Sequence, residues 1–229
     1  MALDVLFPRF CLSCKREGTL WCEMCDAGWV ARPNVASCPF CLSSGSNFVC
    51  SSCREHTFLN GVVSYLPYGN TIVSSAIRVW KYDCDRSIEP VLKHWLAQSV
   101  ERMRPPFASF VVTQVPIHKT RYLSRGFDQS EHLAGWVAEM YAMPFVHFLK
   151  RTRKTISQAK ISHHDRLLGE LDGIFSIHPR VEYIPESVLL CDDVFTSGAT
   201  MDAAARCLKE AGVKNVWGFV IAKGRIRSG

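Results

Sequence analysis

The sequence predicts an α/β fold, in which a mostly parallel sheet is flanked by helices and preceded by a small cysteine-rich domain. Two observations support this. Eight of the 11 cysteines lie within the first 53 residues, and from about residue 60 apolar segments of strand and helix type alternate. The chain has 229 residues, 48% of them apolar, which is enough for one full hydrophobic core. We therefore expect an N-terminal domain at 1–58 and a larger domain at 59–229.

The start of the chain and its apolar runs argue against secretion and membrane insertion. Asp4 and Pro8 interrupt the N-terminal apolar stretch, which no Lys or Arg precedes, so it does not resemble a signal peptide. The apolar run at 105–117 is shorter than the ~20 residues that a membrane helix needs. We expect a cytoplasmic protein, and in that reducing compartment cysteines bind metal more often than they form disulfides.

The N-terminal cysteines form four Cys-x-x-Cys pairs, with seven residues between the first two pairs and eight between the last two. Each pair can direct two thiolates at one ion, and two pairs complete the four-sulfur shell of structural zinc. The intervening segments are too short for a hydrophobic core, so the metal must supply the folding energy. We expect two zinc ribbons with one Zn²⁺ each. Consecutive pairing is favoured, with interleaved pairing or an iron–sulfur cluster as alternatives. The ligands would be Cys11, Cys14, Cys22 and Cys25 for one ion and Cys38, Cys41, Cys50 and Cys53 for the other.

The larger domain alternates strands and helices, which is typical of a parallel sheet covered on both faces. In such a sheet, ligands bind beyond the carboxyl ends of the strands. Strands are expected at 61–66, 110–115, 145–149, 174–177, 188–191 and 216–222. Helices are expected at 72–81, 88–104, 129–141 and 199–211.

The sharpest motif covers residues 188–200. An apolar strand ends in two acids, Asp192 and Asp193, and a hydroxyl-rich loop then opens a helix. The loop can offer backbone N–H groups and hydroxyls to a phosphate, whose negative charge the helix dipole favours. The two carboxylates can accept hydrogen bonds from vicinal ribose hydroxyls. The phosphate-binding residues would be Thr196, Ser197, Gly198, Ala199 and Thr200.

This pattern resembles the signature of type I phosphoribosyltransferases, which bind phosphoribosyl pyrophosphate. The resemblance implies that the acidic pair holds the ribose and that the loop holds the 5-phosphate, with Mg²⁺ accompanying the ligand. It also implies the type I phosphoribosyltransferase fold for the larger domain. Ser197 stands where a second Thr is common, and it keeps the hydroxyl.

Two basic segments and a single lysine are candidates to complete the ligand site. The segment 115–129 follows an expected strand, so its cations would face the same crevice as the acidic pair and suit a pyrophosphate. The stretch 151–166 has no apolar periodicity and is typical of a mobile lid that excludes water from a reactive sugar. The lysine closes the first expected helix, although a lone lysine is more often solvated. The candidates for pyrophosphate and lid contacts are Lys81, Lys119, Arg121, Arg125, Arg151 and Arg153.

Several motifs together resemble the ComF family over nearly the whole chain. That family joins an N-terminal zinc ribbon to a phosphoribosyltransferase-like domain and is associated with uptake of transforming DNA in bacteria; some members are linked to sugar-acid use. Asp128 departs from the family, which usually has Asn there, and the family also has Asn near Glu170. The motifs are the doubled cysteine pairs, Trp80-Lys-Tyr82, Arg125-Gly-Phe-Asp-Gln129, Arg151-Thr-Arg153 with Thr155 and Gln158, and the acidic loop.

The residues leave two main functions open. The preferred one is a protein that binds phosphoribosyl pyrophosphate and is associated with natural transformation, with single-stranded DNA and competence-machinery proteins as partners. The alternative is a catalytic phosphoribosyltransferase that uses a nitrogen acceptor, although residues 60–80 show no recognisable base-reading pattern. A structural scaffold is the weakest interpretation. Trp21 and Trp29, in a small head with little core, are candidates for stacking on nucleobases, although tryptophan is more often buried.

Overall fold

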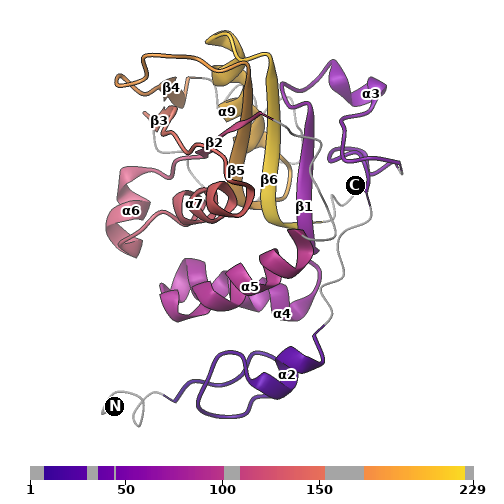
Figure 1. The fold of residues 1–229 in the computed structure, drawn as a ribbon, viewed down its shortest axis with the longest axis vertical. Coiled ribbons are helices and arrows are strands. Elements are labelled where there is room, and N and C mark those ends of the chain that lie inside the picture. The colour runs from indigo at the N-terminus through magenta and orange to yellow at the C-terminus, as the bar shows by residue number, and fades with distance from the viewer. Residues whose placement is uncertain (1–7, 30–35, 44, 101–108, 153–172, 225–229) are drawn as a thin grey trace.

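A computed structural model of the protein describes residues 8–29, 36–43, 45–100, 109–152 and 173–224. Its centre is a four-stranded parallel sheet with the order β1-β6-β5-β2 (Figure 1), which confirms the predicted α/β class. A separate antiparallel pair, β3 and β4, lies beside it. The strands are β1 (Gly61–Pro67), β2 (Val111–Gln114), β3 (Leu149–Arg151), β4 (Phe175–Ile177), β5 (Ser187–Phe195) and β6 (Asn215–Lys223).

Several helices begin at a residue whose side chain accepts hydrogen bonds from N–H groups of the first turn. Asn70 caps α4, where its side chain accepts hydrogen bonds from the N–H groups of Ile72 and Val73. Asp128 caps α7 in the same way. The helices are α2 (Glu23–Ala27), α3 (Ser51–Arg54), α4 (Thr71–Arg78), α5 (Glu89–Val100), α6 (Lys119–Arg125), α7 (Gln129–Tyr141) and α9 (Ala199–Glu210), with a π-helical turn at Val79–Asp83 and a 3-10 turn at Arg86–Ile88.

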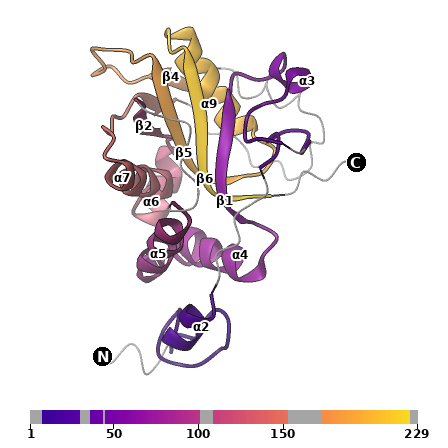
Figure 2. The same cartoon turned by 45° about the vertical axis from the view of Figure 1, so that its right-hand side comes forward.

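The two faces of the sheet pack into two hydrophobic clusters, because neighbouring residues of a strand point to opposite faces. In β5, Leu189 and Cys191 join one cluster, whereas Val188 and Leu190 join the other. Residues of α4, α5 and α7 close the first cluster, and residues of α9 close the second. Figure 2 shows α9 and α7 on opposite sides of the strands. Both faces are buried, as is usual for a parallel sheet.

Two cysteine-rich modules pack against this body at separate places. The first module is residues 9–29, with α2, and the second is residues 36–59 without residue 44, with α3. Figures 1 and 2 place α2 beyond α4 and α5, and α3 beside the sheet near β1. The first module packs against the cluster that α5 closes, and the second packs into the cluster that α9 closes. The proposed domain boundary after residue 58 stays a prediction.

Several element boundaries differ from those predicted. β5 continues to Phe195 rather than ending at residue 191, because β6 pairs with it as far as Lys223. The segment 119–125, expected to lead into a helix, is itself the helix α6. The expected helix 72–81 is divided into α4 and a π-helical turn. The expected strands 145–149 and 174–177 overlap β3 and β4, which pair with each other, while Phe145 forms an isolated parallel bridge with Val112 of β2.

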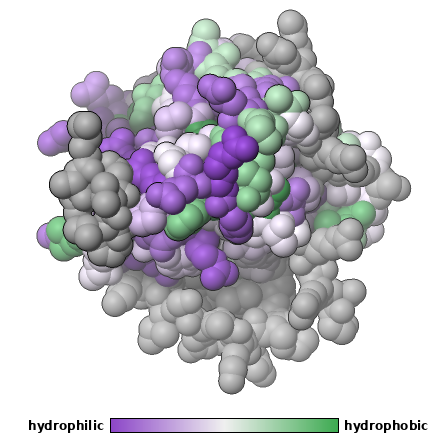
Figure 3. Space-filling model, turned by 90° about the horizontal axis from the view of Figure 1, so that it is seen from below, coloured by the Kyte–Doolittle hydropathy of each residue, from purple (hydrophilic) through white to green (hydrophobic). Residues whose placement is uncertain are grey.

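The helices within the described ranges are all too short or too polar to cross a membrane. Figure 3 views the molecule from the end that carries the first module. Hydrophilic side chains cover the middle of this face, and smaller hydrophobic areas lie between them.

Candidate functional site

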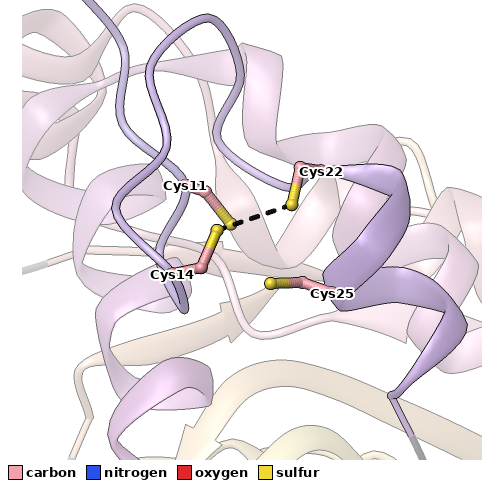
Figure 4. A group of neighbouring side chains, drawn as sticks. All are labelled: Cys11, Cys14, Cys22 and Cys25. Carbon is pink, nitrogen blue, oxygen red and sulfur yellow. Dashed lines mark hydrogen bonds between the residues drawn. The ribbon is translucent and has the colours of Figure 1, made fainter.

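Each module brings four cysteine sulfur atoms together. In both groups the Sγ atoms all lie within 4.8 Å of one another, and Figure 4 shows the four side chains of the first group directed toward a common centre. The Sγ atoms of Cys14 and Cys22 are 3.6 Å apart, and those of Cys41 and Cys50 are 3.5 Å apart. A tetrahedral shell with Zn–S bonds of ~2.3 Å places its sulfurs about 3.8 Å apart. The donor set and its spacing fit one structural Zn²⁺ per module, with consecutive pairing of the cysteine pairs.

The two modules repeat one backbone design. After its first cysteine pair, each chain reverses through a residue with positive φ, which is Lys15 at 61° in the first module and Leu42 at 62° in the second. Gly18 and Gly45 follow at the same spacing, also with positive φ. Their N–H groups donate to the carbonyl two residues before the first cysteine, at 2.8 and 3.3 Å. A short helix then begins within the second cysteine pair of each module. The sequence analysis noted the paired cysteines but missed this structural repeat.

Three of the eight thiols, those of Cys11, Cys41 and Cys50, have a lowered pKa, which favours metal binding because the thiolate is the ligand form. The pKa of Cys41 is lowered to about 6, chiefly because of its hydrogen bond with the Ser43 hydroxyl, at 3.2 Å. At Cys11, burial raises the pKa, but backbone hydrogen bonds from Cys14 and Cys22 outweigh it and the pKa falls to about 6. Each module thus contains a thiol that ionises readily.

The acidic pair lies in the last part of β5, at the carboxyl edge of the sheet. Asp193 is buried and forms an ion pair with Lys81, with 2.7 Å between Oδ1 and Nζ. Asp192 Oδ1 accepts hydrogen bonds from the Ser130 hydroxyl at 2.8 Å and from the Asp193 N–H at 2.9 Å. Lys81 comes from the π-helical turn, a feature that often occurs at functional sites. The structure therefore brings Lys81 and the start of α7 to the two acids.

The charges of this group oppose one another. Burial and the neighbouring charge of Asp193 raise the pKa of Asp192 to about 7, against the opposite effect of Lys81. Burial tends to lower the pKa of Lys81, but the charges of Asp193 and Asp192 outweigh it, and the pKa is raised. Lys81 therefore stays protonated, and Asp192 changes its charge near neutral pH.

The phosphate loop, Thr196–Thr200, connects β5 to α9. Gly198 has φ +80°, and a Cβ atom there would lie 2.4 Å from Phe195 Cζ and 3.0 Å from Phe40 Cε1. Only glycine fits both the backbone conformation and the space. Thr196 and Ser197 are exposed, and the free N–H groups of the 12-residue helix α9 begin directly after Gly198. The loop thus combines exposed hydroxyls with the positive end of a helix dipole.

Arg121 and Arg151 share the electrostatic environment of the acidic pair. The pKa of Arg151 is lowered by burial and by the charge of Arg121, while Asp192 and Asp128 act in the opposite direction. The guanidinium of Arg151 also lies over the Phe175 ring, 5.4 Å from its centroid. Arg151 is therefore within electrostatic reach of Asp192 and of Arg121.

The other candidate cations are placed differently. Arg125 donates to Gln129 Oε1 at 3.0 Å and lies 5.7 Å from the centroid of the Tyr82 ring. Lys119 is exposed at the start of α6. Arg153 and the rest of the predicted lid, apart from Arg151 and residue 152, lie outside the described residues.

Asp128 and Ser130 support the site from the start of α7, and the sequence analysis gave neither a role. Asp128 accepts hydrogen bonds from the N–H groups of Ser130 at 2.9 Å, Glu131 at 3.3 Å and Ile117 at 3.1 Å. It therefore fixes both the helix start and the segment that leads to α6. Asn and Asp both cap helices, so the departure from the family at this position keeps the role. The sequence signal that could have identified them is an acid that can cap a helix, Asp128, followed two residues later by the hydroxyl of Ser130.

Trp21 and Trp29, candidates for stacking on nucleobases in the sequence analysis, are half-buried against the larger domain. Both rings pack against Trp95 of α5, which is fully buried. The centroid of Trp21 lies 4.9 Å from that of Trp95 in an edge arrangement, and Trp29 stacks on Trp95 at 4.6 Å. The first module packs these half-buried tryptophans against α5, a contact that the composition of the module alone could not show.

Comparison with known proteins gives a consistent result. No protein-family model matches the chain. It is 27% identical over 212 residues to the competence protein ComFC of Streptococcus pneumoniae, covering 91% of this chain and 90% of that protein. It is 31% identical over 184 residues to the competence protein ComFC of Bacillus subtilis, covering 76% and 72%. It is 30% identical over 115 residues to the competence protein F of Haemophilus influenzae, covering 48% and 50%. With these similarities and its two four-cysteine clusters, the chain belongs to the ComFC family of competence proteins.

Proposed function

We propose that the protein binds phosphoribosyl pyrophosphate at the junction of β5 and α9 and acts in natural transformation. One observation carries the ligand assignment. Two acids near the end of a central parallel strand are followed, after Val194 and Phe195, by a glycine-containing loop and the first turn of a 12-residue helix. An anion-binding loop beside carboxylates suits a ligand that carries a phosphate and hydrogen-bond donors together, as a ribose 5-phosphate does. The names of the relatives support the role in competence.

Each part of the junction has a defined task in this proposal. Asp192 and Asp193 accept hydrogen bonds from the ribose hydroxyls, and the Ser130 hydroxyl orients Asp192. Lys81 balances the charge of Asp193. The hydroxyls and N–H groups of the phosphate loop bind the 5-phosphate. Mg²⁺, which neutralises pyrophosphate charge, finds oxygen ligands of the type it prefers in the same carboxylates.

Turnover is the second candidate function, and the paired arginines favour it. The charges of Arg121 and Asp192 both act on Arg151, so the two arginines repel each other. A departing pyrophosphate would relieve that repulsion, and cations positioned where charge develops lower a barrier. The reaction would transfer the phosphoribosyl group to a nitrogen acceptor. Release of pyrophosphate on addition of candidate amines or bases tests it.

Single-stranded DNA is the proposed macromolecular partner, together with proteins of the competence machinery. The helix α6 presents Lys119, Arg121 and Tyr122 to solvent and buries none of its residues. Cations interleaved with an aromatic ring suit a single strand. Binding should weaken steeply with added salt, because phosphate contacts release counterions.

Calorimetric titration with magnesium phosphoribosyl pyrophosphate tests the ligand assignment. We expect saturable binding by the wild-type protein. Replacement of both acids, Asp192→Asn with Asp193→Asn, should weaken it by about 100-fold or more, because hydrogen bonds to charged groups contribute about 1.5–3 kcal/mol each. Glu210→Gln is the matched control, since Glu210 is an exposed acid on α9 whose carboxylate pairs with Arg206. A folded wild-type protein that does not bind the ligand would overturn the proposal.

A further inference from the structure

The second cysteine module lies directly against the phosphate loop. The ring of Phe40, between two of the cysteines, contacts the Phe195 ring edge to face, with 5.6 Å between centroids. The same ring lies at the place where a side chain on Gly198 would point, 3.0 Å from an added Cβ atom. Phe40 and Phe195 therefore form an apolar floor beneath the turn of the loop.

A second contact joins the module to the strand ends that carry the loop. Lys223, at the end of β6, donates from Nζ to the Ser37 hydroxyl at 3.0 Å. Lys223 is opposite Phe195 in the β5–β6 register, and the N–H of Gly224 donates to the Phe195 carbonyl at 2.8 Å. The residue that precedes the loop is thus tied to the module through its ring and through its strand partner.

A third contact fixes the helix that follows the loop. Asp202, in the first turn of α9, is fully buried, and its Oδ1 accepts hydrogen bonds from the Thr57 hydroxyl and the Phe58 N–H, at 2.5 and 2.7 Å. Its N–H donates to the Gly198 carbonyl at 2.8 Å. The module therefore contacts the strand end that precedes the loop, the underside of the loop at Gly198, and the helix that follows the loop.

We propose that the second cysteine module is part of the phosphoribosyl site and that Phe40 is a positioning residue for the phosphate loop. Zn²⁺ bound to this module would keep Phe40 beneath Gly198, because two of the four cysteines, Cys38 and Cys41, flank that ring. The second cysteine module, whose metal would have a structural role only, thereby influences the affinity for the 5-phosphate. The ligand in this inference is taken from the proposed function, whereas the contacts between the module and the loop are observed in the structure.

The test compares two phenylalanines of the same module. Phe48 also lies close to a cysteine pair, but its ring packs edge to face on Trp217, at 4.6 Å, away from the loop. We expect Phe40→Ala to weaken binding of ribose 5-phosphate by about tenfold or more, because a small displacement of a binding group is costly. Binding of pyrophosphate, which uses the arginines, should stay unchanged, and Phe48→Ala should bind both as the wild type does. General destabilisation would not separate the two ligands.

A second readout needs no ligand. In the zinc-loaded protein, hydrogen–deuterium exchange of the amides at 196–200 should be faster in Phe40→Ala than in Phe48→Ala. Zinc content of two ions per chain shows that the module is intact; if Phe40→Ala loses zinc, Phe40→Leu replaces it. Unchanged loop exchange with wild-type affinity for ribose 5-phosphate would overturn the inference and leave the proposed function standing. Wild-type protein that binds neither ligand would overturn the proposed function, and loop exchange then decides the positioning role by itself.

Discussion

The two cysteine modules share a backbone design but are attached to different parts of the body. Each has a positive-φ residue after its first cysteine pair, a glycine at the same spacing and a short helix within its second pair. The first module packs its tryptophans on α5, whereas the second packs against the β5–α9 junction. On our proposals, the same cysteine-rich turn serves as an anchor in the first module and as a wall of the ligand site in the second. The side chains between the cysteines decide which, since the metal shell is the same.

Replacement of the first cysteine of each module should separate these roles most strongly. Cys11 and Cys38 occupy equivalent positions, and both are buried. Each change to Ser should remove one of two zinc ions, and a structural zinc supplies about 10–16 kcal/mol of folding energy in isolated zinc-finger peptides. Cys38→Ser should abolish binding of phosphoribosyl pyrophosphate, and Cys11→Ser should retain it. Metal analysis and calorimetry measure both. Equal losses of affinity would show that the modules do not differ in role.

The attachment of the first module should depend on Trp95. Its ring is fully buried and contacts both tryptophans of that module. Trp95→Ala should lower the free energy of unfolding by about 3–5 kcal/mol, because it leaves a large cavity. Hydrogen–deuterium exchange should accelerate at residues 19–29 and not at 36–43. Trp95→Phe, which retains a ring, is the control and should cost less. Faster exchange in both modules would indicate that they are stabilised as one unit.

The contact of the second module with the phosphate loop can be tested at Gly198, with Gly126 as a matched control. Both have φ near +80° and ψ near zero, but an added Cβ meets Phe195 and Phe40 only at Gly198, and at Gly126 it meets nothing within 4 Å. Each change to Ala pays about 1–2 kcal/mol for the left-handed backbone. Gly198→Ala should lose about 1–3 kcal/mol more through overpacking. Denaturant unfolding of the two variants measures this difference. Equal losses in the free energy of unfolding would mean that Phe40 and Phe195 can move to accommodate the added methyl group.

The sequence predicted the parts of the site that are contiguous in the chain. The acids, the loop and the helix after it follow from one motif, because strand, anion loop and helix start are local features. The cysteine groups follow from spacing in the same way. Helix α7 was predicted at its observed residues from its helical pattern, and the cap by Asp128 that fixes its start is also a local feature. Local signals were sufficient wherever local hydrogen bonds decide the structure.

Contacts between segments that are distant in the chain could not be predicted from the sequence. The floor under Gly198 joins Phe40 to Phe195, and no periodicity relates two rings so far apart in the chain. The extension of β5 through both acids depends on the length of β6, which pairs with it. The π-helical turn that carries Lys81 to Asp193 breaks a regular helix pattern. These features follow from packing, which a single sequence shows only after the fold is known.

The remaining expected effect is a pH response that neither module should alter. The pKa of Asp192 is raised from 3.8 to about 7 by burial and by Asp193, so between these values the folded state binds more protons than the unfolded state. The contribution of this group to the free energy of unfolding is therefore present below about pH 4 and is lost as the pH rises through 7. Asp192→Asn removes the response, and the variant should gain stability relative to wild type between pH 5 and pH 8. Denaturant unfolding at both pH values measures the gain.

The same comparison in a Cys11→Ser background provides the control for this response. Asp192 contacts Ser130 and Asp193, and among the described residues its hydrogen bonds do not reach a cysteine module. The gain in stability on Asp192→Asn should therefore be equal with and without the first metal site, because sites without shared partners add. A gain that disappears with the metal would mean that α5, on which the first module packs, transmits its packing to the acidic pair. In that case both modules would influence the ligand site. They would differ in their distance from the ligand and not in their role.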